Sequence, residues 1–127
     1  MIFGRIDEYG RALIDLSLRA TPDSNFEDME VWVDTGFTGD LLLPESLVNR
    51  LALSPSAIVE AVLADGSQNE LVTYSCTVDW FGESRVIEVI ANQGRIPLLG
   101  VGLLLGHRLF VDYEQLTLSI ESPTRKK

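Results

Sequence analysis

The chain has 127 residues, 46% of them hydrophobic and 23% charged, which is typical of one soluble globular domain over 1–127. Its ten Lys and Arg against nineteen Asp and Glu give a formal net charge of -9, so nucleic acid and anionic membranes are disfavoured as partners. Cys76 is the only cysteine, which leaves no disulfide within these residues and favours a reducing, cytoplasmic location.

Short apolar runs between turn signals predict a chain made mostly of β-strands. In chain order, we expect strands over residues 2–6, 11–18, 29–33, 41–43, 57–64, 70–80, 85–90, 97–100, 109–113 and 115–120. Helical spacing of apolar residues predicts a short helix over 45–51, next to Pro44, and another over 101–105 that ends at Gly106. Many short strands at close spacing indicate an all-β sandwich or small barrel with one or two short helices.

The sequence predicts no metal, cofactor or membrane-spanning segment. His107 is the only histidine and has no Cys or His at ligand spacing, so we expect a surface or interface residue rather than a zinc ligand. A nucleophilic Cys76 would have only His107 to activate it, and a small buried residue is the favoured interpretation. The most apolar segment, 96–106, is too short to span a membrane, and residues 1–5 lack the apolar stretch of a signal peptide.

Asp34 is placed where removing a carboxylate from water is costly. It follows the strand-like run Val31-Trp32-Val33 and precedes the apolar run 41–43. In its ordinary interpretation, Asp34-Thr35-Gly36 is a turn in which the acid bonds the backbone and Gly36 supplies a positive φ. A turn acid normally lies among polar residues in water. Because apolar runs enclose this one, we expect its carboxylate to be held inside.

Three elements of the chain resemble the retropepsin-like aspartic proteases. Val33-Asp34-Thr35-Gly36-Phe37-Thr38-Gly39 resembles the active-site signature of that family. Ala64-Asp65-Gly66-Ser67 stands where the family has the tip of its flap hairpin. Pro97-Leu98-Leu99-Gly100 resembles the family's motif of two hydrophobic residues and a glycine, followed by its short helix. Phe37 stands where the viral enzymes have a smaller residue.

The resemblance implies a closed acid-protease barrel that hydrolyses peptide bonds with a water activated between two carboxylates, without a cofactor or metal. Asp34-Thr35-Gly36 occurs once, and 127 residues leave no room for a second lobe. The second carboxylate would therefore come from Asp34 of another copy, across the twofold axis of a homodimer. In the family pattern Asp34 is catalytic, the Thr35 hydroxyl braces the two loops, and Gly36 lets the backbone approach the acid. Phe37 and the flap residues 64–67 would contact substrate.

The expected substrate is an extended peptide, bound as an added strand between the Asp34 loop and the flap. Residues 2–6 and 116–120 are expected to pair with those of the partner and cover exposed edges. Two alternatives stay open. One is a catalytically inactive dimeric peptide-binding module on the same fold. The other is a monomeric structural or interaction domain in which Asp34-Thr35-Gly36 is only a turn.

Overall fold

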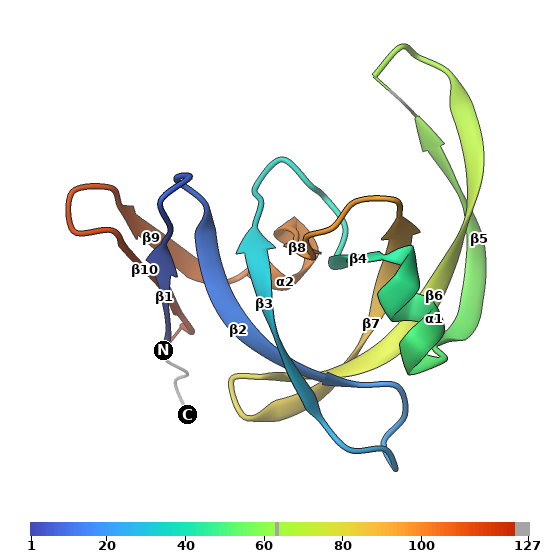
Figure 1. Cartoon of the computed structure of the whole chain (residues 1–127), viewed down its shortest axis with the longest axis horizontal. Coiled ribbons are helices and arrows are strands. Elements are labelled where there is room, and N and C mark those ends of the chain that lie inside the picture. The colour runs from blue at the N-terminus through green and yellow to red at the C-terminus, as the bar shows by residue number, and fades with distance from the viewer. Residues whose placement is uncertain (63, 124–127) are drawn as a thin grey trace.

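The computed structural model describes residues 1–62 and 64–123 and consists mainly of strands (Figure 1). The strands are β1 (Ile2–Ile6), β2 (Ala12–Arg19), β3 (Glu27–Val33), β4 (Leu41–Pro44), β5 (Ser54–Val62), β6 (Gln68–Trp80), β7 (Glu83–Asn92), β8 (Leu98–Leu99), β9 (Arg108–Asp112) and β10 (Thr117–Glu121). The helices are α1 (Glu45–Leu51) and α2 (Val101–Leu104). Each predicted strand and helix is present, with ends shifted by a few residues. The all-β class with two short helices is thus confirmed.

All the strands join one ten-stranded sheet in the order β5-β6-β7-β4-β8-β3-β2-β1-β10-β9. β6 also pairs with β2, so β2, β3, β8, β4, β7 and β6 form a ring of hydrogen-bonded strands. The pairs β3–β8 and β4–β7 are parallel, and the remaining pairs are antiparallel. These pairings alone do not establish the closed barrel that the sequence predicts, so the closed barrel stays a prediction.

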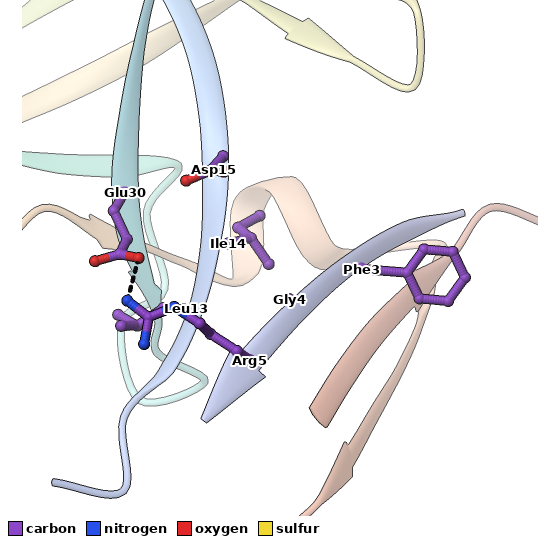
Figure 2. Close-up of a pocket in the computed structure, with 7 residues that line it drawn as sticks. All are labelled: Phe3, Gly4, Arg5, Leu13, Ile14, Asp15 and Glu30. Atoms are coloured by element: carbon purple, nitrogen blue, oxygen red, sulfur yellow. Dashed lines mark hydrogen bonds and ion pairs between the residues drawn. The ribbon is translucent and has the colours of Figure 1, made fainter. Parts of the chain in front are cut away.

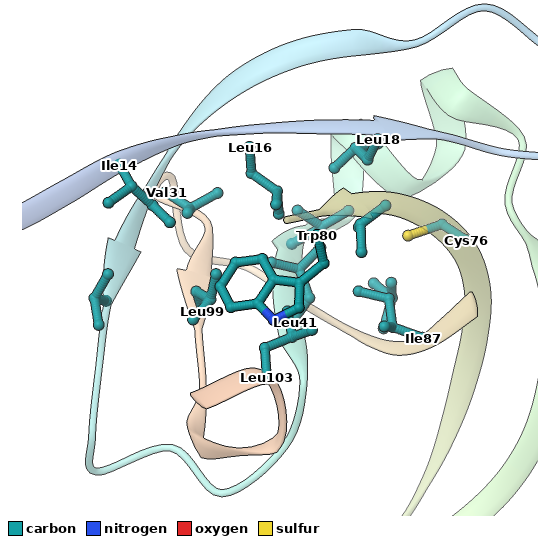
Figure 3. Close-up of a cluster of buried hydrophobic side chains, with 14 of the residues drawn as sticks. Ile14, Leu16, Leu18, Val31, Leu41, Cys76, Trp80, Ile87, Leu99 and Leu103 are labelled. Atoms are coloured by element: carbon teal, nitrogen blue, oxygen red, sulfur yellow. The ribbon is translucent and has the colours of Figure 1, made fainter. Parts of the chain in front are cut away.

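The core is built mainly from the buried faces of these strands and includes Leu103 of α2 (Figure 3). Ile14, Leu16 and Leu18 share one face of β2, as predicted, and each is at most 2% exposed. Trp80 lies in the middle of the cluster beside Leu41 and is 4% exposed. Full burial of one such aliphatic side chain contributes roughly 1.5–3 kcal/mol, so this face fixes the register of β2.

The first and last strands pair with each other inside the chain, whereas the sequence analysis expects them to pair with those of a partner copy. Ile2 lies opposite Ile120, and Arg5 lies opposite Thr117. β10 is also paired with β9 on its other side, so it has no free edge for a partner copy. The β9–β10 hairpin folds back onto β1 and occupies the backbone groups that a lone terminal strand would leave open. The edge of this end of the sheet is β9.

Candidate active site

Asp34 is the first residue after β3, at the start of a loop over residues 34–40. Its N–H donates to the carbonyl oxygen of Leu99 on the neighbouring β8, at 2.9 Å. The carboxylate is half-buried, whereas Thr35 and Gly36 are exposed. The expectation of an enclosed acid is therefore met only in part. Val33 points into the core, and the alternation of a strand directs the next side chain outward.

The turn at Asp34 has the predicted hydrogen bond but not the predicted glycine conformation. Asp34 Oδ1 accepts the Gly36 N–H at 2.9 Å, which is the bond of an Asx turn. In the described residues, the glycines with positive φ are Gly10, Gly66, Gly82 and Gly106, so Gly36 does not use that freedom. A Cβ at Gly36 would lie 3.2 Å from Asp34 Oδ1. Glycine here keeps the space beside the carboxylate open.

The start of α2 holds the loop from behind. Backbone N–H groups there donate to carbonyl oxygens of the loop: Gly100 to Asp40 at 2.9 Å, Val101 to Phe37 at 2.7 Å and Gly102 to Gly39 at 2.9 Å. Together with the bond from Asp34 to Leu99, they fix both ends and the middle of the loop. The motif Pro97-Leu98-Leu99-Gly100 therefore lies behind the loop that carries Asp34.

Only glycine fits at position 100. A Cβ there would lie 2.2 Å from the Gly39 carbonyl oxygen and 2.6 Å from that of Phe37, closer than close-packed atoms come. The same Cβ would lie 2.5 Å from the Phe37 ring, so this half-buried ring covers Gly100. Part of Phe37 is thus used to pack the loop against α2, and its expected contact with substrate stays a prediction.

Asp40 ends the loop and is not among the site residues predicted from the sequence. Its Oδ2 accepts the N–H of Glu88 on β7 at 3.1 Å. A Cβ at Gly102 would lie 2.0 Å from Asp40 Oδ1, so glycine makes room for this carboxylate beside α2. Asp40 therefore ties the end of the loop to β7 while lying against α2. The sequence around Asp40 shows only an acid directly after Gly39 and before an apolar run. It does not reveal the bond to Glu88, because that residue is 48 positions away.

The predicted flap is the hairpin of β5 and β6, which projects beyond the rest of the chain (Figure 1). At its tip Gly66 has φ +88°, and Asp65 Oδ1 accepts the Ser67 N–H at 2.9 Å and the Ser67 hydroxyl at 2.6 Å. The hydroxyl bond, and then the backbone bond, lower the pKa of the Asp65 carboxyl below its ordinary value. Ala64, the last residue of the strand expected over 57–64, is in the exposed turn, and Leu63 lies outside the described residues.

The sequence matches no protein-family model, and a search of curated proteins found no match. Solved structures do resemble it. A retropepsin-like aspartic protease from Rickettsia conorii superimposes with a TM-score of 0.66 and 19% identity, over 95% of this chain and 89% of that one. The EIAV protease, complexed with the inhibitor HBY-793, gives 0.53 and 18% identity over 77% and 88%. The fold is that of the retropepsin-like aspartic proteases.

On this retropepsin-like fold, the predicted site residues form two groups. Asp34, Thr35, Gly36 and Phe37 lie together in the loop that α2 supports. The flap residues 64–67 lie at the tip of a separate hairpin. The resemblance drawn from the short motifs is therefore confirmed at the level of the fold.

Cys76 and His107 occupy structural positions. Cys76 on β6 is 1% exposed, and burial, followed by the charge of Asp40, raises the pKa of its thiol to about 12. It is the small buried residue that we expected. His107 is half-buried rather than on the open surface. Its ring stacks on Phe81, with 4.9 Å between centroids, and meets the Trp80 ring edge-on at 5.7 Å.

A pocket of about 290 Å³ lies over β1, β2 and β3, and its lining does not include the Asp34 loop (Figure 2). The Arg5–Glu30 ion pair, 2.6 Å long, crosses it. Phe3 lies at its rim, directed away from Leu13 and 73% exposed.

Within residues 1–62 and 64–123, no group of three or more His, Cys, Asp and Glu is placed to hold a metal ion. No helix of that part of the chain is long and apolar enough to cross a bilayer.

Proposed function

We propose that this chain is an aspartic endopeptidase that acts as a homodimer, with one Asp34 from each subunit in a shared site. The observation that carries this proposal is the support of Asp34. A half-buried carboxylate at the end of β3 stands in a loop fixed by α2, on a fold of the retropepsin-like type. Asp34-Thr35-Gly36 occurs once in the chain, so a second copy must supply the other carboxylate.

The chemistry needs two carboxylates that share one proton. Like charges held close together do not both ionise, so one Asp34 stays protonated while the other acts as the base. The base takes a proton from a water molecule, which attacks the peptide carbonyl carbon. The protonated acid hydrogen-bonds the carbonyl oxygen and then helps to protonate the leaving amine. The two groups titrate as a pair, so neither has a pKa of its own.

The neighbouring residues take supporting roles in this proposal. The exposed Thr35 hydroxyl braces the two loops across the axis, and Gly36 donates its N–H to the acid. Gly100 and Asp40 act as positioning residues, because they hold the loop without reaching the reacting atoms. The exposure of Thr35 and Gly36 in the single chain supports a partner that covers them.

The substrate of this proposal is an extended peptide between the Asp34 loop and the flap. Exposed apolar side chains on the β5–β6 hairpin support this, because a peptide with apolar side chains would cover them. Ile58 lies directly opposite Val72 on one face of the hairpin, and these two are 68% and 45% exposed. Phe37 and the tip residues 64–67 complete the contact surface.

The proposal also includes a closed barrel around the core. It includes a cytoplasmic location as well, and the lone buried thiol of Cys76 supports that location.

The decisive test compares wild type with Asp34→Asn in hydrolysis of an unfolded protein from mildly acidic to neutral pH. The amide cannot act as the base, so we expect cleavage to fall by on the order of a thousandfold or more. Binding of a peptide fragment of the same substrate should persist, since the loop and flap are unchanged. Fluorescence anisotropy of the labelled fragment measures it.

Asp23→Asn is the matched control, because it removes the same charge from the exposed loop before β3, at the opposite end of that strand from Asp34. It should cleave like wild type. If wild type and Asp34→Asn bind the fragment equally and neither cleaves it, the inactive peptide-binding module is the correct description. Equal cleavage by both would show that Asp34 is not the catalytic acid.

A further inference from the structure

The flap hairpin leaves the rest of the sheet at a definite point. β6 pairs with β7 from Trp80 back to Thr73, and closer to the tip it pairs with β5 alone among the described strands. Residues 58–62 and 68–72 therefore form a two-stranded ribbon that projects from the molecule (Figure 1). Because such a ribbon has no third strand to hold it, the geometry at its base decides where the tip lies.

A β-bulge marks this base on β5. Pro55 lies opposite Tyr74, and Ala57 lies opposite Thr73. Ser56 is thus the extra residue, with no partner on β6. A bulge bends its strand, increases the local twist and redirects the side chains beside it. The bend of the flap hairpin relative to the sheet is therefore set around Ser56.

The Ser56 hydroxyl is held by Glu88 of β7. It donates to Glu88 Oε1 at 3.1 Å, and the two residues are 32 positions apart. β6 lies between β5 and β7 in the sheet, so this bond bridges strands that are two spacings, roughly 10 Å, apart. The Glu88 side chain therefore ties the bulge at the base of the flap hairpin to β7.

The same residue also contacts the Asp34 loop. The backbone N–H of Glu88 donates to Asp40 Oδ2 at 3.1 Å, and Asp40 is the last residue of that loop. Glu88 is thus bonded to the base of the flap hairpin through its side chain and to the loop through its backbone. A peptide held between flap and loop needs the two at a fixed separation, and a residue bonded to both is suited to set it.

We propose that Glu88 is a positioning residue for substrate, which acts through Ser56 to hold the flap hairpin where it can bind an extended peptide over the Asp34 loop. This inference rests on the proposed function, in which the peptide lies between these two parts. The flap contacts the peptide before and during the reaction, so a displaced flap weakens binding of substrate and transition state alike. It therefore raises KM without lowering kcat. Side-chain variants of Glu88 keep its N–H, and hence the bond to Asp40.

Two substitutions remove the bond from either side. In the Asp34→Asn background, Ser56→Ala and Glu88→Ala should each weaken binding of the labelled peptide fragment. Because both groups are exposed, we expect the dissociation constant to rise by on the order of three- to tenfold. The double variant should bind no worse than either single variant, since both lose the same bond. Fluorescence anisotropy measures all four constants. In the active protein, KM should rise by the same factor while kcat stays within about twofold.

A conservative variant separates the bond from the charge. Glu88→Gln keeps an oxygen that accepts the Ser56 hydroxyl, and Glu88 forms no ion pair within residues 1–62 and 64–123. This variant should therefore bind like wild type. Ser54→Ala and Glu83→Ala are the matched controls, because Ser54 is an exposed hydroxyl on β5 and Glu83 an exposed acid at the start of β7. Both should leave binding unchanged.

Hydrogen exchange examines the flap hairpin without a substrate. In Ser56→Ala and Glu88→Ala, the amides of residues 57–62 and 68–72 should exchange faster than in wild type, because the base of the ribbon opens more often. The amides of β2 should keep their wild-type rates, which shows that the rest of the chain is folded. Mass spectrometry of peptic fragments measures both regions in one sample.

The outcomes distinguish this inference from the proposed function. Faster exchange in the flap hairpin together with weaker peptide binding in both variants supports it. Unchanged exchange there, or unchanged binding, overturns it whether or not the chain cleaves peptides. A fall in kcat at unchanged KM overturns it as well. A wild-type chain that binds the fragment without cleaving it leaves the role of Glu88 to the binding and exchange results, and only the proposed catalysis fails. A wild-type chain that does not bind the fragment overturns both.

Discussion

At the scale of single residues, Gly100 shows how the loop of Asp34 is positioned without any contact to the carboxylate. The position serves two needs at once: its N–H bonds Asp40, and its missing side chain lets the loop backbone approach. In the sequence, the motif that contains Gly100 is visible only through its resemblance to a family. The physical reason for the glycine came from the distances of 2.2 and 2.6 Å to two carbonyl oxygens.

Gly100→Ala should therefore destabilise the chain and disturb the site. Because the added methyl group meets backbone rather than a movable side chain, we expect a loss of roughly 1–3 kcal/mol in the free energy of unfolding. Urea denaturation followed by circular dichroism measures it. Gly94→Ala is the matched control, since a Cβ there meets only the end of the Asn92 side chain, at 3.1 Å. Equal stability of the two variants would show that the loop adapts to a side chain at position 100.

At the scale of elements, the flap hairpin is a long antiparallel pair whose tip is fixed by local bonds. Val62 pairs with Gln68, and beyond this pair the bonds from Ser67 to Asp65 hold the turn. Both Ser67 bonds go to the charged form of the acid and lower its pKa in the folded state. They therefore stabilise the turn fully above the ordinary Asp value of 3.8, and this contribution is lost as the pH falls through the lowered pKa.

The flap turn should accordingly stay intact at mildly acidic pH and loosen only in stronger acid. Titration of the Asp65 carboxyl carbon and the Ser67 amide by NMR should give a midpoint below 3.8. Ser67→Ala removes the bond with the largest effect and should move the midpoint back toward the ordinary value, while the backbone bond remains. A midpoint at or above the ordinary value in wild type would contradict the hydrogen bonds at the tip.

At the scale of the whole molecule, the proposed enzyme is complete only as two chains. Each subunit supplies one Asp34, so the concentration of active sites follows the dimer and not the chain. Well below the dimer dissociation constant, a tenfold dilution should lower the specific activity about tenfold by mass action. Initial rates of peptide cleavage over a dilution series measure this. A specific activity that stays constant as sedimentation shows dissociation to monomers would mean that a single chain is active.

The sequence by itself determined the local elements and pointed to the candidate site. The periodicity of apolar residues located each strand, and α1 covers the predicted residues 45–51 because Leu47, Val48 and Leu51 recur at helical spacing. Polar residues with glycine marked the turn at Asp65-Gly66-Ser67. The single copy of Asp34-Thr35-Gly36 is the basis of the proposal that the other carboxylate lies on another chain.

Only the tertiary structure decided which strands are neighbours and how far Asp34 is buried. Periodicity tells which face of a strand is apolar, but strand order depends on contacts between residues distant in the chain. The internal place of β10 and the bond from Glu88 to Asp40, 48 positions apart, are of this kind. The same cause left β9 as the open edge, since the edge of a sheet is defined by the neighbour that a strand lacks.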